Sequence, residues 1–186
     1  MNDRERRLLI LSFLCGIAFF GTLQYAMYVY EDTDGEFEIN RNFISDLGHE
    51  EDTKWLFLLS MVIGAISVAA FWYISPSMLS VYTANLMTNE EDSSSSRIKV
   101  PETLIQYNAY LGMFASLFMP FIAIFHSKNS PEFHYFAAGG FLILMTIAMA
   151  VYSGVIYQIN RAKAEKSKTP LDDIGFTVVG IGLIGA

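Results

Sequence analysis

Four long apolar runs constrain this chain more than any other feature of its sequence. They cover residues 8–30, 55–75, 104–125 and 133–157. A helix of about 20 apolar residues crosses a hydrocarbon core about 30 Å thick, and its backbone groups then bond to one another. The composition agrees, because 53% of the residues are hydrophobic and 17% are charged. The sequence therefore predicts an all-α integral membrane protein, an antiparallel bundle of transmembrane helices.

The flanks of the runs carry boundary signals. The first run ends in aromatic residues rather than in the small residues that precede a signal-peptide cleavage site, so we expect a retained helix. Trp55 and Trp72 lie near the two ends of the second run, as interfacial aromatics do. Pro76 ends or kinks that helix, and the segment after it is either an amphipathic stretch in the interface or a bent extension. The short connection HSKNSPE makes the third and fourth runs antiparallel neighbours.

A fifth apolar segment has the glycine-rich sequence IGFTVVGIGLIGA, residues 174–186. It is too short to cross a bilayer. We therefore interpret it as the beginning of a fifth span, which residues beyond it or another chain complete. Residues 1–186 then form a single transmembrane domain, with four complete spans and part of a fifth.

Lysine and arginine are distributed unevenly among the connections. They gather before the first run, in the loop 88–102 and in the loop 159–173, whereas the loop 31–54 is mostly acidic. Short basic loops are retained on the cytoplasmic side of a membrane. We therefore expect a cytoplasmic N-terminus, a flexible cytoplasmic loop at 88–102, a basic cytoplasmic loop at 159–173 and an acidic outer loop at 31–54.

This orientation places all three histidines, His49, His126 and His134, on the outer side of the membrane. Histidines and carboxylates can form a zinc site or a pair for acid–base chemistry. These histidines lack the spacing of a metal motif, in which two of them lie four residues apart on one helix. The acidic residues 31–38 likewise lack the spacing of a calcium loop. We therefore expect no metal and no cofactor, and we interpret residues 31–38 as a solvated loop.

The segment ISDLG in the outer loop combines short polar residues with an apolar residue and a glycine. One interpretation is structural: Ser45 and Asp46 cap a re-entrant turn, Leu47 anchors it and Gly48 permits a tight reversal. The other is functional: Ser45, Asp46 and His49 present hydrogen-bonding groups to a molecule at the membrane surface. Short polar residues serve turns well, which favours the structural interpretation on chemistry alone.

The two interpretations share one spatial prediction. We expect ISDLG to fold back against the outer ends of the third and fourth helices. Ser45 and Asp46 would then lie near His134, which can donate a hydrogen bond to a carboxylate in the partly dehydrated interface.

The outer-loop sequence NFISDLG resembles a motif of small membrane proteins in the domain-of-unknown-function 998 family and in the related DRAM-like group. FHYFAAGGF resembles the histidine that opens the fourth helix in that group. The matching positions are Ser45, Asp46, Leu47, Gly48, His134, Ala137, Ala138 and Phe141, with Pro120 as a further match. The resemblance implies a fold of about six helices and a shared polar site at Ser45, Asp46 and His134. It implies no catalytic residue, and the long acidic loop departs from the family pattern.

Small residues occur within the spans at helix-packing spacing. The pairs are Ala65 with Ala69, Gly112 with Ser116, and Ala150 with Gly154. Such pairs let helix backbones approach closely, within the bundle or against membrane-protein partners. The spans carry no ionisable residue of the kind that marks an ion or proton path.

Three functions are compatible with these features. The first is an interaction with lipid head groups or a protein partner through a polar site formed by Ser45, Asp46, Gly48, His49, His126 and His134. The second is an accessory subunit of a larger membrane complex. The third is a membrane-embedded lipid hydrolase or transferase, which the absence of a G-x-S-x-G nucleophile motif disfavours. The net charge of −7 argues against a nucleic-acid partner. We therefore expect membrane lipids as partners and no catalytic residues.

Overall fold

The computed structural model of the chain describes residues 2–34, 44–48, 51–87, 101–125 and 130–167. Every regular element in these ranges is helical. The elements are α1 (Asp3–Asp34), the 3-10 helix η1 (Ile44–Gly48), α2 (Lys54–Met87), α3 (Glu102–Ser116), α4 (Phe118–Ile124) and α5 (Pro131–Ser167).

Four stretches of these helices are long and apolar enough to cross a membrane. They are Asp3–Tyr30, Lys54–Thr83, Glu102–Ile124 and Pro131–Arg161, the third formed by α3 and α4 together. The predicted all-α membrane bundle with four spans is therefore confirmed. The predicted fifth segment, residues 174–186, lies outside the described residues.

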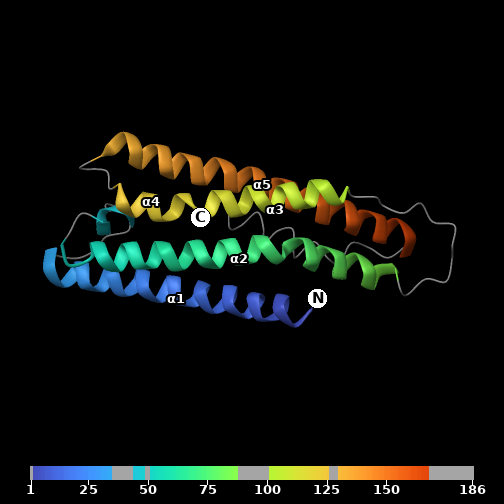
Figure 1. Cartoon of the computed structure of the whole chain (residues 1–186), viewed down its shortest axis with the longest axis horizontal. Coiled ribbons are helices and arrows are strands. Elements are labelled where there is room, and N and C mark those ends of the chain that lie inside the picture. Colours follow the sequence, from blue (N-terminus) through green and yellow to red (C-terminus); the bar gives the residue numbers. More distant parts are fainter. Residues whose placement is uncertain (1, 35–43, 49–50, 88–100, 126–129, 168–186) are drawn as a thin grey trace.

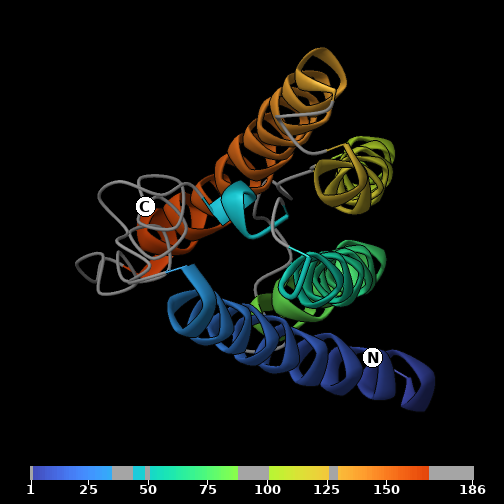
Figure 2. The same ribbon diagram turned by 90° about the vertical axis from the view of Figure 1, so that its left-hand side faces the viewer.

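The helices form an open arc. α1 packs against α2, α2 packs against α3 and α4, and these two pack against α5. Figure 1 shows the helices running alongside one another, and Figure 2 shows the arc from one end. Of the most apolar window of α1 and of α5, 11% is buried, against 39% for α2 and for the third span. The two outermost helices therefore leave most of their surface to lipid or to other helices.

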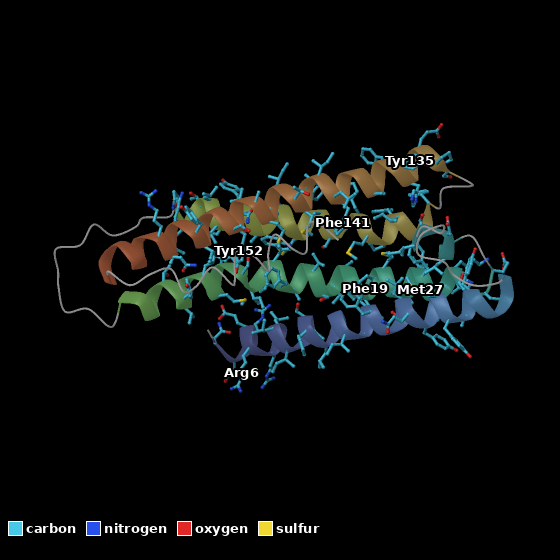
Figure 3. The ribbon with its side chains drawn as sticks, turned by 180° about the vertical axis from the view of Figure 1, so that it is seen from behind. Arg6, Phe19, Met27, Tyr135, Phe141 and Tyr152 are labelled. Carbon is cyan, nitrogen blue, oxygen red and sulfur yellow. The ribbon has the colours of Figure 1, made fainter. Side chains whose placement is uncertain are left out.

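The two ends of the arc differ. η1 lies at the end formed by the start of α2, by α4 and by the start of α5; we call this the η1 end. The opposite end, which holds the start of α1 and the last turns of α2 and α5, we call the far end. A buried apolar cluster fills the η1 half of the arc; its members are Leu23, Ala26, Leu47, Phe57, Met61, Met119 and Ala123. Figure 3 shows Phe19 and Met27 of α1 lying beside α2, and both pack on this cluster.

Hydrogen bonds from hydroxyl groups also join the helices to one another. Ser12 of α1 donates its hydroxyl to the Ser67 carbonyl at 2.8 Å, and Ser67 of α2 donates to the Ser12 carbonyl at 2.7 Å. Nearer the far end, Tyr82 of α2 donates to Asn160 Oδ1 of α5 at 2.5 Å. Such bonds help to hold transmembrane helices together, because lipid supplies no hydrophobic force between them.

Pro76 kinks α2 without ending it. The helix continues through Pro76 to Met87, so the bent extension is the correct alternative of the two predicted. Proline has no N–H for the Trp72 carbonyl, four residues earlier. The Ser75 hydroxyl donates to that carbonyl at 2.8 Å and satisfies it within an apolar region. α5 likewise runs past its predicted end at residue 157, so the loop predicted at 159–173 is helical as far as Ser167.

The third span is interrupted at Leu117, between α3 and α4. Its amide donates to the Phe114 carbonyl at 3.1 Å, three residues back. Pro120 follows, and it cannot donate to the Ser116 carbonyl. The interruption therefore has the usual cause of a helix break, a proline in the next turn.

The three predicted small-residue pairs have different surroundings. Gly112 and Ser116 are buried, and Gly112 lies directly against the indole ring of Trp72. Ala65 and Ala69 are half-buried on α2. Ala150 and Gly154 are exposed, and a Cβ built on Gly154 meets no atom within 4 Å. In the described part of the chain no atom packs against Gly154 at this distance, so the packing of this last pair against a partner stays a prediction.

Candidate functional site

A buried side chain and a hydrogen bond to the start of α2 help to hold η1 in place. Leu47 has no exposed surface and belongs to the apolar cluster of the η1 half. Thr53, which is also fully buried, donates its hydroxyl to the Leu47 carbonyl at 2.6 Å. Together they fix ISDLG to the start of α2, so this segment is a built part of the fold rather than a free connector.

The two polar residues of η1 remain partly accessible. Ser45 and Asp46 are half-buried, whereas Leu47 and Gly48 are buried. A 3-10 helix has three residues per turn, so these four neighbours divide between a core side and a rim side. Their short turn therefore presents a hydroxyl and a carboxylate at the rim of the arc.

His134 lies in the first turn of α5 and is 6% exposed. Its Nδ1 atom is 2.8 Å from the Phe125 carbonyl oxygen and 3.2 Å from the Ile122 carbonyl oxygen. Carbonyl oxygens only accept, so Nδ1 carries the proton. α4 ends at Ile124, and its last carbonyls have no partner further along the helix. His134 supplies that partner and joins the end of α4 to the start of α5.

The position of ISDLG agrees with the spatial prediction in part. η1 packs against α4, which forms the end of the third span that was predicted to face outward. Its other main contacts are with α2 and α1, and α5 is not among the helices against which it mainly packs. His134 and η1 thus meet the same helix, α4. The Nδ1 of His134 is committed to backbone carbonyls of α4 rather than to the carboxylate of Asp46.

The remaining predicted site residues, His49 and His126, lie outside the described residues. Among the described residues, no group of three or more His, Cys, Asp or Glu side chains is placed to hold a metal ion. Gly48 is buried at the end of η1. Of the six predicted site residues, four are described by the structure: Ser45, Asp46 and Gly48 in η1, and His134 in α5.

Charge at the η1 end is predominantly acidic. Glu51 and Asp52 are exposed before α2, and Glu132 is exposed at the start of α5. The ammonium of Lys54 lies 2.6 Å from Glu51 Oε1 and 5.8 Å from the centre of the Trp55 ring. This cation is therefore already held by a carboxylate and an aromatic face.

Thr53 is the site residue that sequence reasoning missed. Its position directly before an apolar helical run is a known signal for the start of a helix. That signal predicts a local role for the hydroxyl. Its bond to a carbonyl six residues earlier follows only once η1 is known to turn back toward α2.

Four membrane-length helices, with a polar 3-10 turn seated at one end, define a multi-pass α-helical membrane protein. The chain matches the family model described as Frag1/DRAM/Sfk1/Cwh43P N-terminal domain over residues 7–176, and it belongs to that family of membrane proteins. The resemblance to the DRAM-like group is confirmed by this match, which does not extend to the 998 family. No curated protein and no solved structure matches the chain.

Proposed function

We propose that the protein interacts with phospholipid head groups at the membrane surface, through the polar rim of η1. The observation that carries the proposal is the anchoring of η1. Leu47 is fully buried and bonded through its carbonyl to Thr53, while Ser45 and Asp46 stay partly accessible. Such anchoring is compatible with the structural interpretation, and it also supports the functional one, because a binding group benefits from being held by a rigid scaffold.

The charge of the η1 end supports one class of head group. The charged residues near η1 include Asp46, Glu51, Asp52, Glu132 and Lys54, and Lys54 is paired with Glu51. Carboxylates repel an anionic head group and attract an ammonium group. An exposed aromatic face adds to that attraction, and Tyr135 is 68% exposed. Figure 3 shows Tyr135 at the start of α5, at the η1 end. Zwitterionic lipids that carry ethanolamine or choline fit this rim.

The test is a lipid-binding measurement on the full chain. Phosphatidylethanolamine, phosphatidylcholine and phosphatidylserine are added to the detergent-solubilised protein, and bound lipid is counted by native mass spectrometry. We expect the first two to bind more tightly than phosphatidylserine at this site. Asp46→Asn should weaken their binding about fivefold or more, because it removes a half-buried charge that faces the ammonium.

Asp52→Asn is the matched control, because Asp52 is exposed at the same end and undergoes the same change of charge. It should alter binding less than twofold. If the two substitutions weaken lipid binding equally, the lipid is attracted by the acidic surface in general and not by a site at η1. If neither substitution changes lipid binding, the proposed role of η1 is excluded.

A second function, that of an accessory subunit in a larger membrane complex, is favoured by a different observation. α5 presents the small residues Ala150 and Gly154 on an exposed face, and nothing in the described part of the chain packs against Gly154. Purification in a gentle detergent followed by mass measurement tests this function. A stable stoichiometric partner supports the subunit, and a chain that carries only lipid supports the head-group proposal.

A further inference from the structure

The first three turns of α1 border a hollow of about 400 Å³ at the far end of the arc. Its described lining residues are Asp3, Arg4, Arg7, Leu8 and Leu11. The hollow is remote from η1, and the proposal above makes no use of it. The hollow is open and its lining surface is mostly apolar, while two of its lining residues are exposed arginines, which suits a ligand with both an apolar and a charged part.

The order of these residues along the helix is informative. With 3.6 residues per turn, positions 4, 7, 8 and 11 share one face of α1. That face begins with two arginines near the helix start and continues with Leu8 and Leu11 toward the middle of the membrane. Leu11 is 43% exposed and Leu14, one turn further on, is 56% exposed. A phospholipid has the same order, with its phosphate at the surface and its acyl chains below.

Glu5, the acidic residue between Arg4 and Arg6 in the sequence, is bonded to residues other than these arginines. Glu5 Oε1 accepts from the Ser77 hydroxyl of α2 at 2.7 Å, and Glu5 Oε2 accepts from the Asn2 amide at 2.8 Å. Neither Arg4 nor Arg7 forms an ion pair with a described residue. The described lining residues therefore carry two positive charges, those of Arg4 and Arg7, against the single negative charge of Asp3, a net charge of +1 at the edge of a mostly apolar hollow.

We propose that this hollow binds one anionic phospholipid, whose phosphate lies between Arg4 and Arg7 and whose acyl chains lie along Leu8 and Leu11. Guanidinium groups bind phosphate oxygens in a bidentate manner, and basic residues beside a membrane attract anionic lipids. A cytoplasmic N-terminus, as predicted, would place the hollow in the leaflet that is rich in such lipids. The anionic preference is opposite to the one proposed for the η1 end.

The experiment uses the full chain in detergent, with phosphatidylserine or phosphatidylcholine as the added lipid and native mass spectrometry as the readout. We expect phosphatidylserine to bind here in preference to phosphatidylcholine. Arg4→Gln and Arg7→Gln should each weaken phosphatidylserine binding about fivefold, the factor that corresponds to about 1 kcal/mol per basic residue near an anionic surface. Inorganic phosphate at millimolar concentration should not displace the lipid, because it makes no contact with the two leucines.

Arg6→Gln is the matched control. Arg6 is exposed and lies about half a turn away from the lining residues, and Figure 3 shows it projecting away from the other helices. It should weaken phosphatidylserine binding less than twofold. A loss equal to that of Arg4→Gln would show a non-specific attraction to the basic N-terminus and overturn the site. Displacement by inorganic phosphate would also overturn it, in favour of a free-phosphate site.

The Asp46→Asn variant should leave phosphatidylserine binding at this hollow unchanged, which separates this inference from the proposed function.

Discussion

Two residues show how single side chains determine the packing of this protein: Gly112 by its lack of a side chain, and His134 by a hydrogen bond to the backbone. Gly112 lies so close to Trp72 that there is no room for a side chain. A Cβ at this position would lie 2.2 Å from Cδ2 of Trp72, closer than any real contact. The indole is fully buried and makes a T-shaped contact with Tyr152, so it has little freedom to move. Figure 3 shows Tyr152 on the α5 side of this contact.

Gly112→Ala should therefore lower the free energy of unfolding by about 1–3 kcal/mol, the usual cost of adding a methyl group to a packed core. Gly154→Ala is the control, since nothing lies within 4 Å of its added Cβ. It should leave stability unchanged or raise it, because alanine is the better helix former. Denaturation of both variants in mixed micelles measures the difference. A Gly112→Ala variant as stable as the parent would show that the indole can shift at no cost.

His134 acts by donating a hydrogen bond to a backbone carbonyl, that of Phe125. His134→Ala leaves the Phe125 carbonyl without its 2.8 Å donor at a partly buried helix end. The loss should be about 1 kcal/mol of unfolding free energy or somewhat more, because an acceptor without a donor costs about 1–3 kcal/mol when it is fully buried. His134→Asn keeps an N–H donor at a similar distance from the backbone and should recover part of it. Equal destabilisation by Ala and Asn would mean that ring packing, not the hydrogen bond, is what stabilises this junction.

At the scale of elements, η1 depends on its attachment to the start of α2. Thr53→Val keeps the shape of the side chain and removes the hydroxyl that bonds the Leu47 carbonyl. Hydrogen exchange at residues 44–48 should accelerate at least tenfold, because a loss of about 1.4 kcal/mol or more lies within the range for a buried carbonyl left unsatisfied. Thr53→Ser retains the hydroxyl and should exchange like the parent. If Thr53→Val also exchanges like the parent, Leu47 alone is sufficient to anchor η1.

The α1–α2 pair depends on two reciprocal serine bonds. Ser12→Ala and Ser67→Ala should each cost about 0.6 kcal/mol and at most about 1.7 kcal/mol, the range for hydrogen bonds between transmembrane helices. The two serines bond each other's backbone, so their effects are coupled, and the difference between the double variant and the sum of the single variants measures that coupling. Ser80→Ala is the control, because Ser80 is exposed and bonds only within α2. A null result for the double variant would assign the α1–α2 contact to apolar packing alone.

The elements also show what the sequence could predict. The four spans follow from length and apolar content, and the anchoring role of Leu47 follows from an apolar residue in a polar loop. The path of α2 beyond Pro76 does not follow. Proline is compatible with both a kink and an end, and the outcome depends on the Ser75 hydroxyl that satisfies the freed carbonyl. The partner of His134 was not predictable either, because the carbonyls it meets depend on where α4 ends.

For the whole molecule, orientation in the membrane remains a prediction from the distribution of basic residues. It is tested in a Cys15→Ser background, which removes the single native cysteine. A cysteine placed by Glu36→Cys should react with a membrane-impermeant maleimide added from outside, and one placed by Ser94→Cys should not. The reverse labelling would invert the topology, and the η1 end would then face the cytoplasm.

The arc also has a consequence for how the protein is made. α1 packs along its length against α2, the next helix to be synthesised, and the two serine bonds lie within that pair. The hairpin of α1 and α2 can therefore form most of its contacts before the ribosome has produced α3. The first two helices can leave the translocon as one finished unit and offer a ready surface on which the later helices assemble.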